Sequence, residues 1–86
     1  MTLESLRCFC AVVEHGSFRA AAGHLHRSQP AVSQQLKALE RELGHTLVDR
    51  REGRATPLGE LLYERARRIL LSVDSLACEV ADFEEG

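Results

Sequence analysis

The 86-residue sequence lacks any long apolar run, because its hydrophobic residues (44% of the chain) alternate with charged residues (28%). A helix that crosses a membrane needs about 20 consecutive apolar residues, so no membrane span is expected. The first four residues, Met1 to Glu4, also lack the basic and then apolar layout of a signal peptide. The composition excludes a disordered acidic tail or a low-complexity segment. We expect one small domain with an appendage, working in the cytoplasm.

Motifs for catalysis and for metal binding are missing as well. The sequence has no nucleophile motif, no phosphate-binding glycine loop and no carboxylate pair placed for acid and base work, so we expect no enzyme. The cysteines are odd in number and form no Cys-x-x-Cys pair, which favours reduced, partly buried thiols: Cys8, Cys10 and Cys78. The histidines lie near expected helix ends or turns, where capping or exposure is favoured over metal binding: His15, His24, His26 and His45. We expect no cofactor within the chain.

Acidic residues are absent from the middle of the chain, although the formal net charge is −2. Between Glu14 and Glu40 every charged side chain is basic, and three further arginines follow soon after: the set is Arg19, Arg27, Lys37, Arg50, Arg51 and Arg54. From Ile69 to Gly86 the pattern reverses, because this segment contains acids but neither Lys nor Arg. This distribution predicts a surface that meets phosphate on one side only.

Caps and helical spacing predict three helices before residue 45. Thr2 is expected to cap the first, which ends at Gly16, and Ser17 to cap a second from Phe18 to about Leu25. Ser28 or Gln29 caps the third, which has Pro30 in its first turn and ends before Gly44. This third helix, 29–43, has a narrow apolar stripe that we expect to be buried: Val32, Leu36, Leu39 and Leu43. Its opposite side carries small or hydrogen-bonding residues: Pro30, Ser33, Gln34, Lys37 and Arg41.

Two short strands joined by a glycine-containing turn are predicted after the third helix, and Thr56 followed by Pro57 marks another helix start. This last helix is expected to run to about Phe83 with a heptad pattern. One seam position holds Gly59, Ala66, Val73 and Val80, and the other holds Leu62, Ile69, Leu76 and Phe83. Such a seam predicts a homodimer through this helix, although burial against its own domain is the alternative. We therefore divide the chain into a winged helix-turn-helix, 1–56, and a dimerisation helix, 57–86.

The exposed residue types on the third helix suit duplex DNA. Gln pairs with adenine, Lys with guanine, and Ser with either, while Pro or Ala rests against a thymine methyl group. Arginines in the hairpin, 47–56, would lie beside flanking phosphates or a narrow minor groove. The predicted DNA-binding set is Arg27, Ser28, Gln29, Pro30, Ser33, Gln34, Lys37, Arg50, Arg51 and Arg54. The arginines at 7, 65, 67 and 68 are favoured as surface or dimer-edge charges, although Arg67 and Arg68, like Arg41, remain candidates for phosphate contact.

Many spaced residues resemble the amino-terminal DNA-binding domain of LysR-type transcriptional regulators. They are Gly16-Ser17-Phe18, Ala21-Ala22, Leu25, the run from Ser28 to Leu36, Leu39-Glu40, Leu43-Gly44, Leu47, Arg50, Thr56 and Gly59. The resemblance implies a mainly α winged helix-turn-helix, a linker helix that dimerises, and transcriptional control in a bacterium. It implies base contacts at the start of the third helix, and an inducer held by an effector domain outside this chain. Val48 and Leu58 depart from the family pattern, which usually has an aromatic and a small residue there.

The competing interpretations are simpler. Any amphipathic helix has a solvated polar face opposite its core stripe, so the third helix alone does not establish DNA binding. A second hypothesis is a helical protein-interaction module that dimerises without DNA specificity. Such a module would show no salt-dependent binding to duplex DNA.

Overall fold

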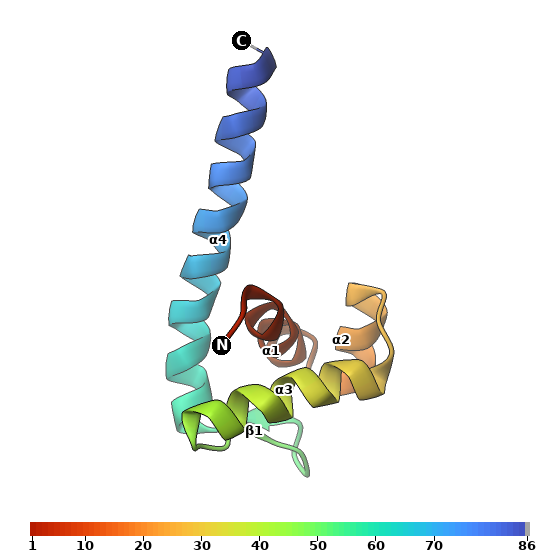
Figure 1. Ribbon diagram of the computed structural model, residues 1–86. Helices are drawn as coiled ribbons and strands as arrows, with labels where there is room; N and C mark the ends of the chain where they lie inside the picture. The colour runs from red at the N-terminus through yellow and green to blue at the C-terminus, as the bar shows by residue number, and fades with distance from the viewer. Residues whose placement is uncertain (86) are drawn as a thin grey trace.

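The computed structural model describes residues 1–85, which form helices and one antiparallel hairpin around a single core. The elements are α1 (Leu3–His15), α2 (Phe18–Leu25), α3 (Gln29–Leu43), β1 (Val48–Asp49), β2 (Arg54–Ala55) and α4 (Pro57–Glu85). In Figure 1, α1 lies above α3, α2 packs at one end of α3, and α4 extends away from them. The molecule is accordingly elongated, 49 × 24 × 19 Å.

The helix boundaries follow the capping residues, as predicted. The Thr2 hydroxyl accepts the Ser5 N–H at 3.0 Å, while the Ser5 hydroxyl accepts the Thr2 N–H at the same distance. Ser17 and Ser28 cap α2 and α3 with one bond each, because their hydroxyls accept the N–H of Ala20 and of Ala31. Gly16 and Gly44 end α1 and α3 with φ values of 76° and 74°, in the left-handed region that glycine adopts at little cost.

The core lies between α1 and the helices and hairpin around it. Phe9 of α1 is fully buried and belongs to the same apolar cluster as Leu36 of α3 and Leu47 of the segment before β1. The predicted stripe on α3 is confirmed, because Val32, Leu36 and Leu39 are at most 1% exposed and Leu43 packs against the cluster from its edge. Because this stripe is buried, the orientation of α3 about its own axis is fixed, and the opposite face of the helix is exposed to solvent.

The hairpin is short and depends on its neighbours, since two isolated strands are marginal in water. Val48 pairs with Ala55, and Asp49 with Arg54. At its base the Thr56 hydroxyl donates to the carbonyl of Thr46 at 2.9 Å and accepts the N–H of Gly59 at 3.1 Å. Thr56 therefore caps α4, as predicted, and joins its first turn to the segment before β1.

Helix α4 extends to Glu85, beyond the predicted end near Phe83. Its first half packs on the domain: Ala66 is 1% exposed, and Leu70, outside the predicted seam, is also buried. Gly59 and Ala66 are thus covered by their own protomer, which corrects their placement on an open seam. Leu62 also packs against the core cluster, and Val73 is half-buried. The other seam residues further along are exposed, and Phe83 is 87% exposed. Among residues 1–85, no helix combines the length and the continuous apolar character that a membrane span requires.

The thiols are not alike. Cys8 and Cys10 are buried in the core, whereas Cys78 is exposed on α4, so the prediction of partial burial was wrong for Cys78. Burial is the main cause that raises the pKa of Cys10 to about 11, and the nearby Glu14 carboxylate adds to the effect. The four histidines are exposed, as expected, and His26 ends α2.

Candidate nucleic-acid interface

The exposed side of α3 is polar and begins at the first turn of the helix. Gln29, Pro30, Gln34 and Lys37 are exposed, and Ser33 is half-buried among them. The Ser28 hydroxyl is already engaged, because it accepts the N–H of Ala31 at 3.2 Å. Its role in the structure is that of a cap, which leaves the longer amide and amine side chains to extend from the helix.

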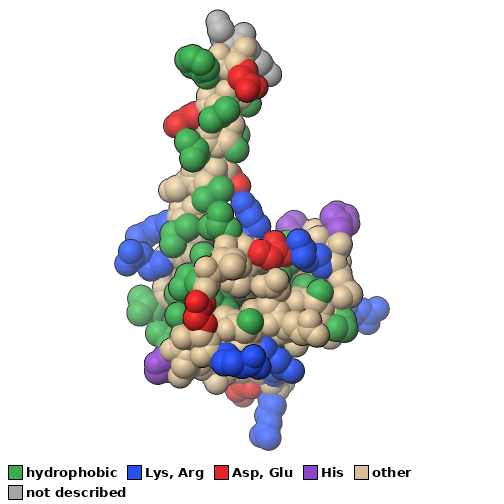
Figure 2. Space-filling model, in the orientation of Figure 1, with side chains coloured by type: hydrophobic (Ala, Val, Ile, Leu, Met, Phe, Trp, Pro, Cys, Tyr) green, Lys and Arg blue, Asp and Glu red, His purple; other side chains and the backbone are tan. Residues whose placement is uncertain are grey.

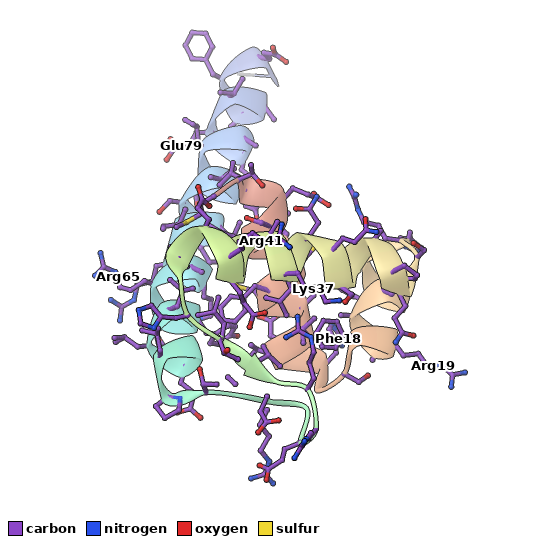
Figure 3. The ribbon with its side chains drawn as sticks, turned by 60° about the horizontal axis from the view of Figure 1, so that its bottom comes forward. Phe18, Arg19, Lys37, Arg41, Arg65 and Glu79 are labelled. Atoms are coloured by element: carbon purple, nitrogen blue, oxygen red, sulfur yellow. The ribbon has the colours of Figure 1, made fainter. Side chains whose placement is uncertain are left out.

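Basic side chains continue this face. Figure 3 shows Lys37 and Arg41 on the side of α3 that is turned toward the viewer, with the hairpin on the same side of the molecule. Figure 2 shows Lys and Arg side chains gathered over α3 and again beneath it at the hairpin. The free end of α4 carries hydrophobic and acidic side chains instead (Figure 2). The charge separation expected from the sequence is therefore also a separation in space.

The tip of the hairpin presents two arginines. Arg51 and Arg54 are exposed, and neither has an ion-pair partner among the described side chains of residues 1–84. The Asp49 carboxylate accepts the backbone N–H of Arg51 at 2.9 Å, and the Asp49 carbonyl accepts that of Gly53 at 2.8 Å. Gly53 has φ 67°, so the turn uses a conformation that suits glycine.

Two predicted DNA-binding residues have partners within the protein. Arg50 donates to the Glu40 carboxylate at 3.0 Å and lies over the ring of Phe18 at 5.3 Å. Arg27 pairs with Glu4 of α1 at 2.8 Å. These guanidinium groups differ from those of the exposed wing arginines, because their charge is already partly neutralised.

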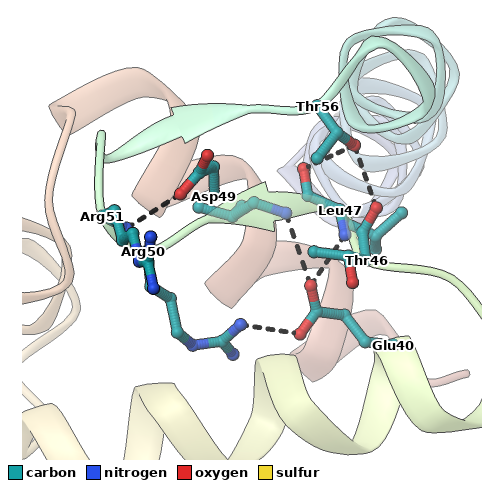
Figure 4. Close-up of polar contacts among 8 residues, drawn as sticks. Glu40, Thr46, Leu47, Asp49, Arg50, Arg51 and Thr56 are labelled. Atoms are coloured by element: carbon teal, nitrogen blue, oxygen red, sulfur yellow. Dashed lines mark hydrogen bonds and ion pairs between the residues drawn. The ribbon is translucent and has the colours of Figure 1, made fainter.

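Glu40, the acid at which the basic stretch ends, was not predicted as a site residue. Its carboxylate accepts the N–H of Leu47 at 2.7 Å and that of Val48 at 3.3 Å, besides pairing with Arg50 (Figure 4). Only 12% of the Glu40 side chain is exposed. One signal in the sequence could have identified Glu40: it is an acid in an otherwise basic region, directly after the core residue Leu39.

The root of α4 is held to α1 by polar contacts as well as by the core. Tyr63 donates its hydroxyl to the Glu14 carboxylate at 2.8 Å, and Arg7 donates to Asp74 at 3.1 Å. The hydrogen bond to Glu14 is the largest cause that raises the pKa of Tyr63 to about 12. Helix α4 therefore leaves the domain in a defined direction, which sets where a second protomer would lie.

The geometry defines a winged helix-turn-helix: α2 and α3 joined by a short turn, with the hairpin beside α3. Residues 3–60 match the family model described as bacterial regulatory helix-turn-helix protein, lysR family. The chain belongs to this LysR family.

Relatives and solved structures agree with this assignment. The chain is 44% identical over 78 residues to the transcriptional regulator BenM of Acinetobacter baylyi, and 42% identical over 86 residues to CfxR of Cupriavidus necator. These alignments cover 88% and 100% of this chain but only 26% of each relative, so the chain spans about a quarter of their length. The BenM DNA-binding domain in complex with catB site 1 DNA superposes with a TM-score of 0.94 at 40% identity, covering 100% of this chain and 99% of that one.

Proposed function

We propose that this chain binds duplex DNA sequence-specifically for transcription regulation, with α3 (29–43) in the major groove and the wing (47–56) on the backbone or minor groove. The proposal rests on the orientation of α3 about its own axis. Its apolar stripe is buried, and its amides and amine are exposed on a side without acids until Glu40. An exposed face of this kind at the start of a helix matches the element that helix-turn-helix proteins insert into DNA.

The exposed residues divide by chemistry into two groups. Gln29 and Gln34 can accept from and donate to an adenine edge, and Lys37 reaches the acceptors of guanine. Arg51 and Arg54 neutralise phosphates, which gives affinity but little sequence information. The solved complexes of the BenM DNA-binding domain and of full-length CbnR with DNA support DNA binding by this fold, because this chain matches both with TM-scores of 0.94 and 0.88. The division of the surface rests on the chemistry of the exposed side chains alone.

The test compares two glutamines that follow one another on α3. Gln34→Ala removes an exposed base-reading amide and should cost about 1 to 3 kcal/mol on the preferred site, with relaxed sequence preference. Gln35→Ala is the matched control, because Gln35 is half-buried and lines a cleft with Met1 and Thr2 at the start of α1. The preferred duplex is first selected from a random pool, and binding is then measured against scrambled duplexes. A Gln34→Ala protein that keeps the full preference of the parent would show that the assigned face is wrong.

We further propose that two copies dimerise through α4. Beyond the domain this helix exposes seam residues with nothing packed on them, including Leu76 at 61% and Val80 at 53%. Its free end is acidic, whereas Arg65, Arg67 and Arg68 lie nearer its root. In a parallel pair the acidic ends of the two helices would face each other and repel. Charge therefore favours an antiparallel pair, in which the acidic end of each α4 lies beside the arginines in the first half of its partner.

A pair of lysine substitutions tests this dimer. Leu76→Lys puts a charge on the seam and should shift the protein toward monomer, because an unpaired buried charge is costly. Cys78→Lys puts the same charge on the outer side of the same turn and should leave the dimer intact. Sedimentation at matched concentrations distinguishes them, and identical behaviour of both variants would contradict an interface on this seam.

The proposed activity is binding rather than catalysis, and it takes place in the cytoplasm, where a bacterial regulator meets its DNA. The chain covers about a quarter of BenM and CfxR. We place the recognition of a small-molecule inducer outside these residues, in an effector domain of the whole regulator.

A further inference from the structure

The hairpin is connected to α3 by one nearly buried carboxylate. One carboxylate oxygen of Glu40 accepts two backbone N–H groups at the start of the wing, those of Leu47 and Val48. The other carboxylate oxygen of Glu40 receives the guanidinium of Arg50, at the end of β1. A single side chain on α3 therefore holds three groups of the wing, and Figure 4 shows that these contacts converge on it.

Arg50 extends the same connection to α2. Its guanidinium lies over the ring of Phe18, the first residue of α2, at 5.3 Å. The wing is thus attached to both helices of the helix-turn-helix. The strands themselves are two residues each, so they supply little independent rigidity.

We infer that Glu40 and Arg50 form a positioning pair that fixes the wing against α3, so that Arg51 and Arg54 lie on the DNA-facing side, and that neither member of the pair contacts DNA. This inference rests on the proposed DNA binding. The inference differs from the sequence-based prediction, which placed Arg50 among the residues that bind DNA. In the structure the guanidinium of Arg50 is paired with the Glu40 carboxylate instead.

The two possible roles of Glu40 predict opposite changes in DNA affinity when its charge is removed. Removing an acid close to a phosphate-binding surface should strengthen DNA binding, because the acid repels the backbone. If Glu40 instead holds the wing arginines in place, its neutralisation weakens binding. The sign of the change in affinity therefore separates the two roles.

Glu40→Gln is the decisive variant. A glutamine keeps the side-chain length and one oxygen for the amides of Leu47 and Val48, but it loses the charge that pairs with Arg50. Glu52→Gln is the charge-matched control. Glu52 is exposed near the tip of the hairpin, and the contacts between the wing and the helices do not involve its carboxylate. Binding of each protein to the selected duplex is measured over a range of salt concentrations.

We expect Glu40→Gln and Arg50→Ala each to weaken binding and to lower the salt dependence by up to about two units, since each phosphate contact of Arg51 and Arg54 contributes about 0.9. The double variant should be no weaker than either single variant, because both changes release the same wing. Glu52→Gln should bind at least as tightly as the parent. Equal or tighter binding by Glu40→Gln, or a loss of about one unit confined to Arg50→Ala, would overturn the inference.

Amide hydrogen exchange provides a second measurement that does not use DNA. In Glu40→Gln the N–H groups of Gly53 and Thr56, which bond across the hairpin, should exchange faster than in the parent, while amides in the middle of α1 keep their protection. Unchanged exchange at both hairpin amides would refute positioning by this pair. If the parent protein shows no salt-dependent binding to any duplex, the proposed function fails, and hydrogen exchange still decides whether Glu40 fixes the wing.

Discussion

Gly59→Ala tests the close approach between the first turn of α4 and Leu47, directly before β1. A Cβ atom at this position would lie 2.0 Å from the carbonyl oxygen of Leu47 and 3.3 Å from the Cβ of Ala55. Helix propensity alone favours the alanine by about 1 kcal/mol. The contact opposes it, because the atom at 2.0 Å belongs to the backbone and cannot rotate away.

The size of the destabilisation follows from the displacement of α4 away from Leu47 that the added methyl group requires. Overpacking costs about 1 to 3 kcal/mol. Separating α4 from Leu47 also disturbs the 2.9 Å hydrogen bond from Thr56 N–H to Leu47 and the Thr56 cap, at about 1 kcal/mol each. After the gain in propensity is subtracted, Gly59→Ala should destabilise the fold by roughly 2 to 4 kcal/mol. A domain of this size has a total stability on the order of 5 to 13 kcal/mol, so this is a large fraction.

Gly23→Ala is the matched control. Gly23 lies within α2, and a Cβ atom there would meet nothing within 4 Å. This variant should gain up to about 1 kcal/mol from propensity, so the same substitution has opposite signs at the two positions. Urea unfolding followed by circular dichroism measures both free energies of unfolding, at matched protein concentration because dimerisation adds to apparent stability. A Gly59→Ala protein as stable as the parent would refute the packing described for this junction.

Two further predictions concern titratable groups. Tyr63, the one tyrosine of the chain, should titrate near pH 12 by ultraviolet absorbance, and Glu14→Gln should bring its pKa back toward 10.0. Because the folded state holds this proton more tightly, its contribution to stability is present below pH 10 and is lost as the pH rises toward 12, which unfolding at several pH values measures. A thiol reagent at pH 8 should modify Cys78 quickly and the buried Cys8 and Cys10 only slowly, whereas three equally fast thiols would contradict the core described for α1.

The sequence alone determined the helices and the orientation of α3. Caps such as Thr2, Ser17 and Gly44 act on residues within a few positions, and the leucine stripe of α3 has a period that belongs to the helix itself. Both are local properties, so they can be predicted without knowing what packs against them. The exposed amides of α3 followed directly, because they lie opposite the stripe.

Tertiary structure decided which charges are free and which apolar residues are covered. Arg50 and Arg51 are neighbours in sequence, yet only Arg50 meets Glu40, ten residues away. Ala66 and Leu76 follow the same heptad, but α1 covers the root of α4 and leaves its far end uncovered. These differences arise because a contact between distant segments depends on the direction in which each helix leaves the core, and spacing along one helix carries no information about that direction.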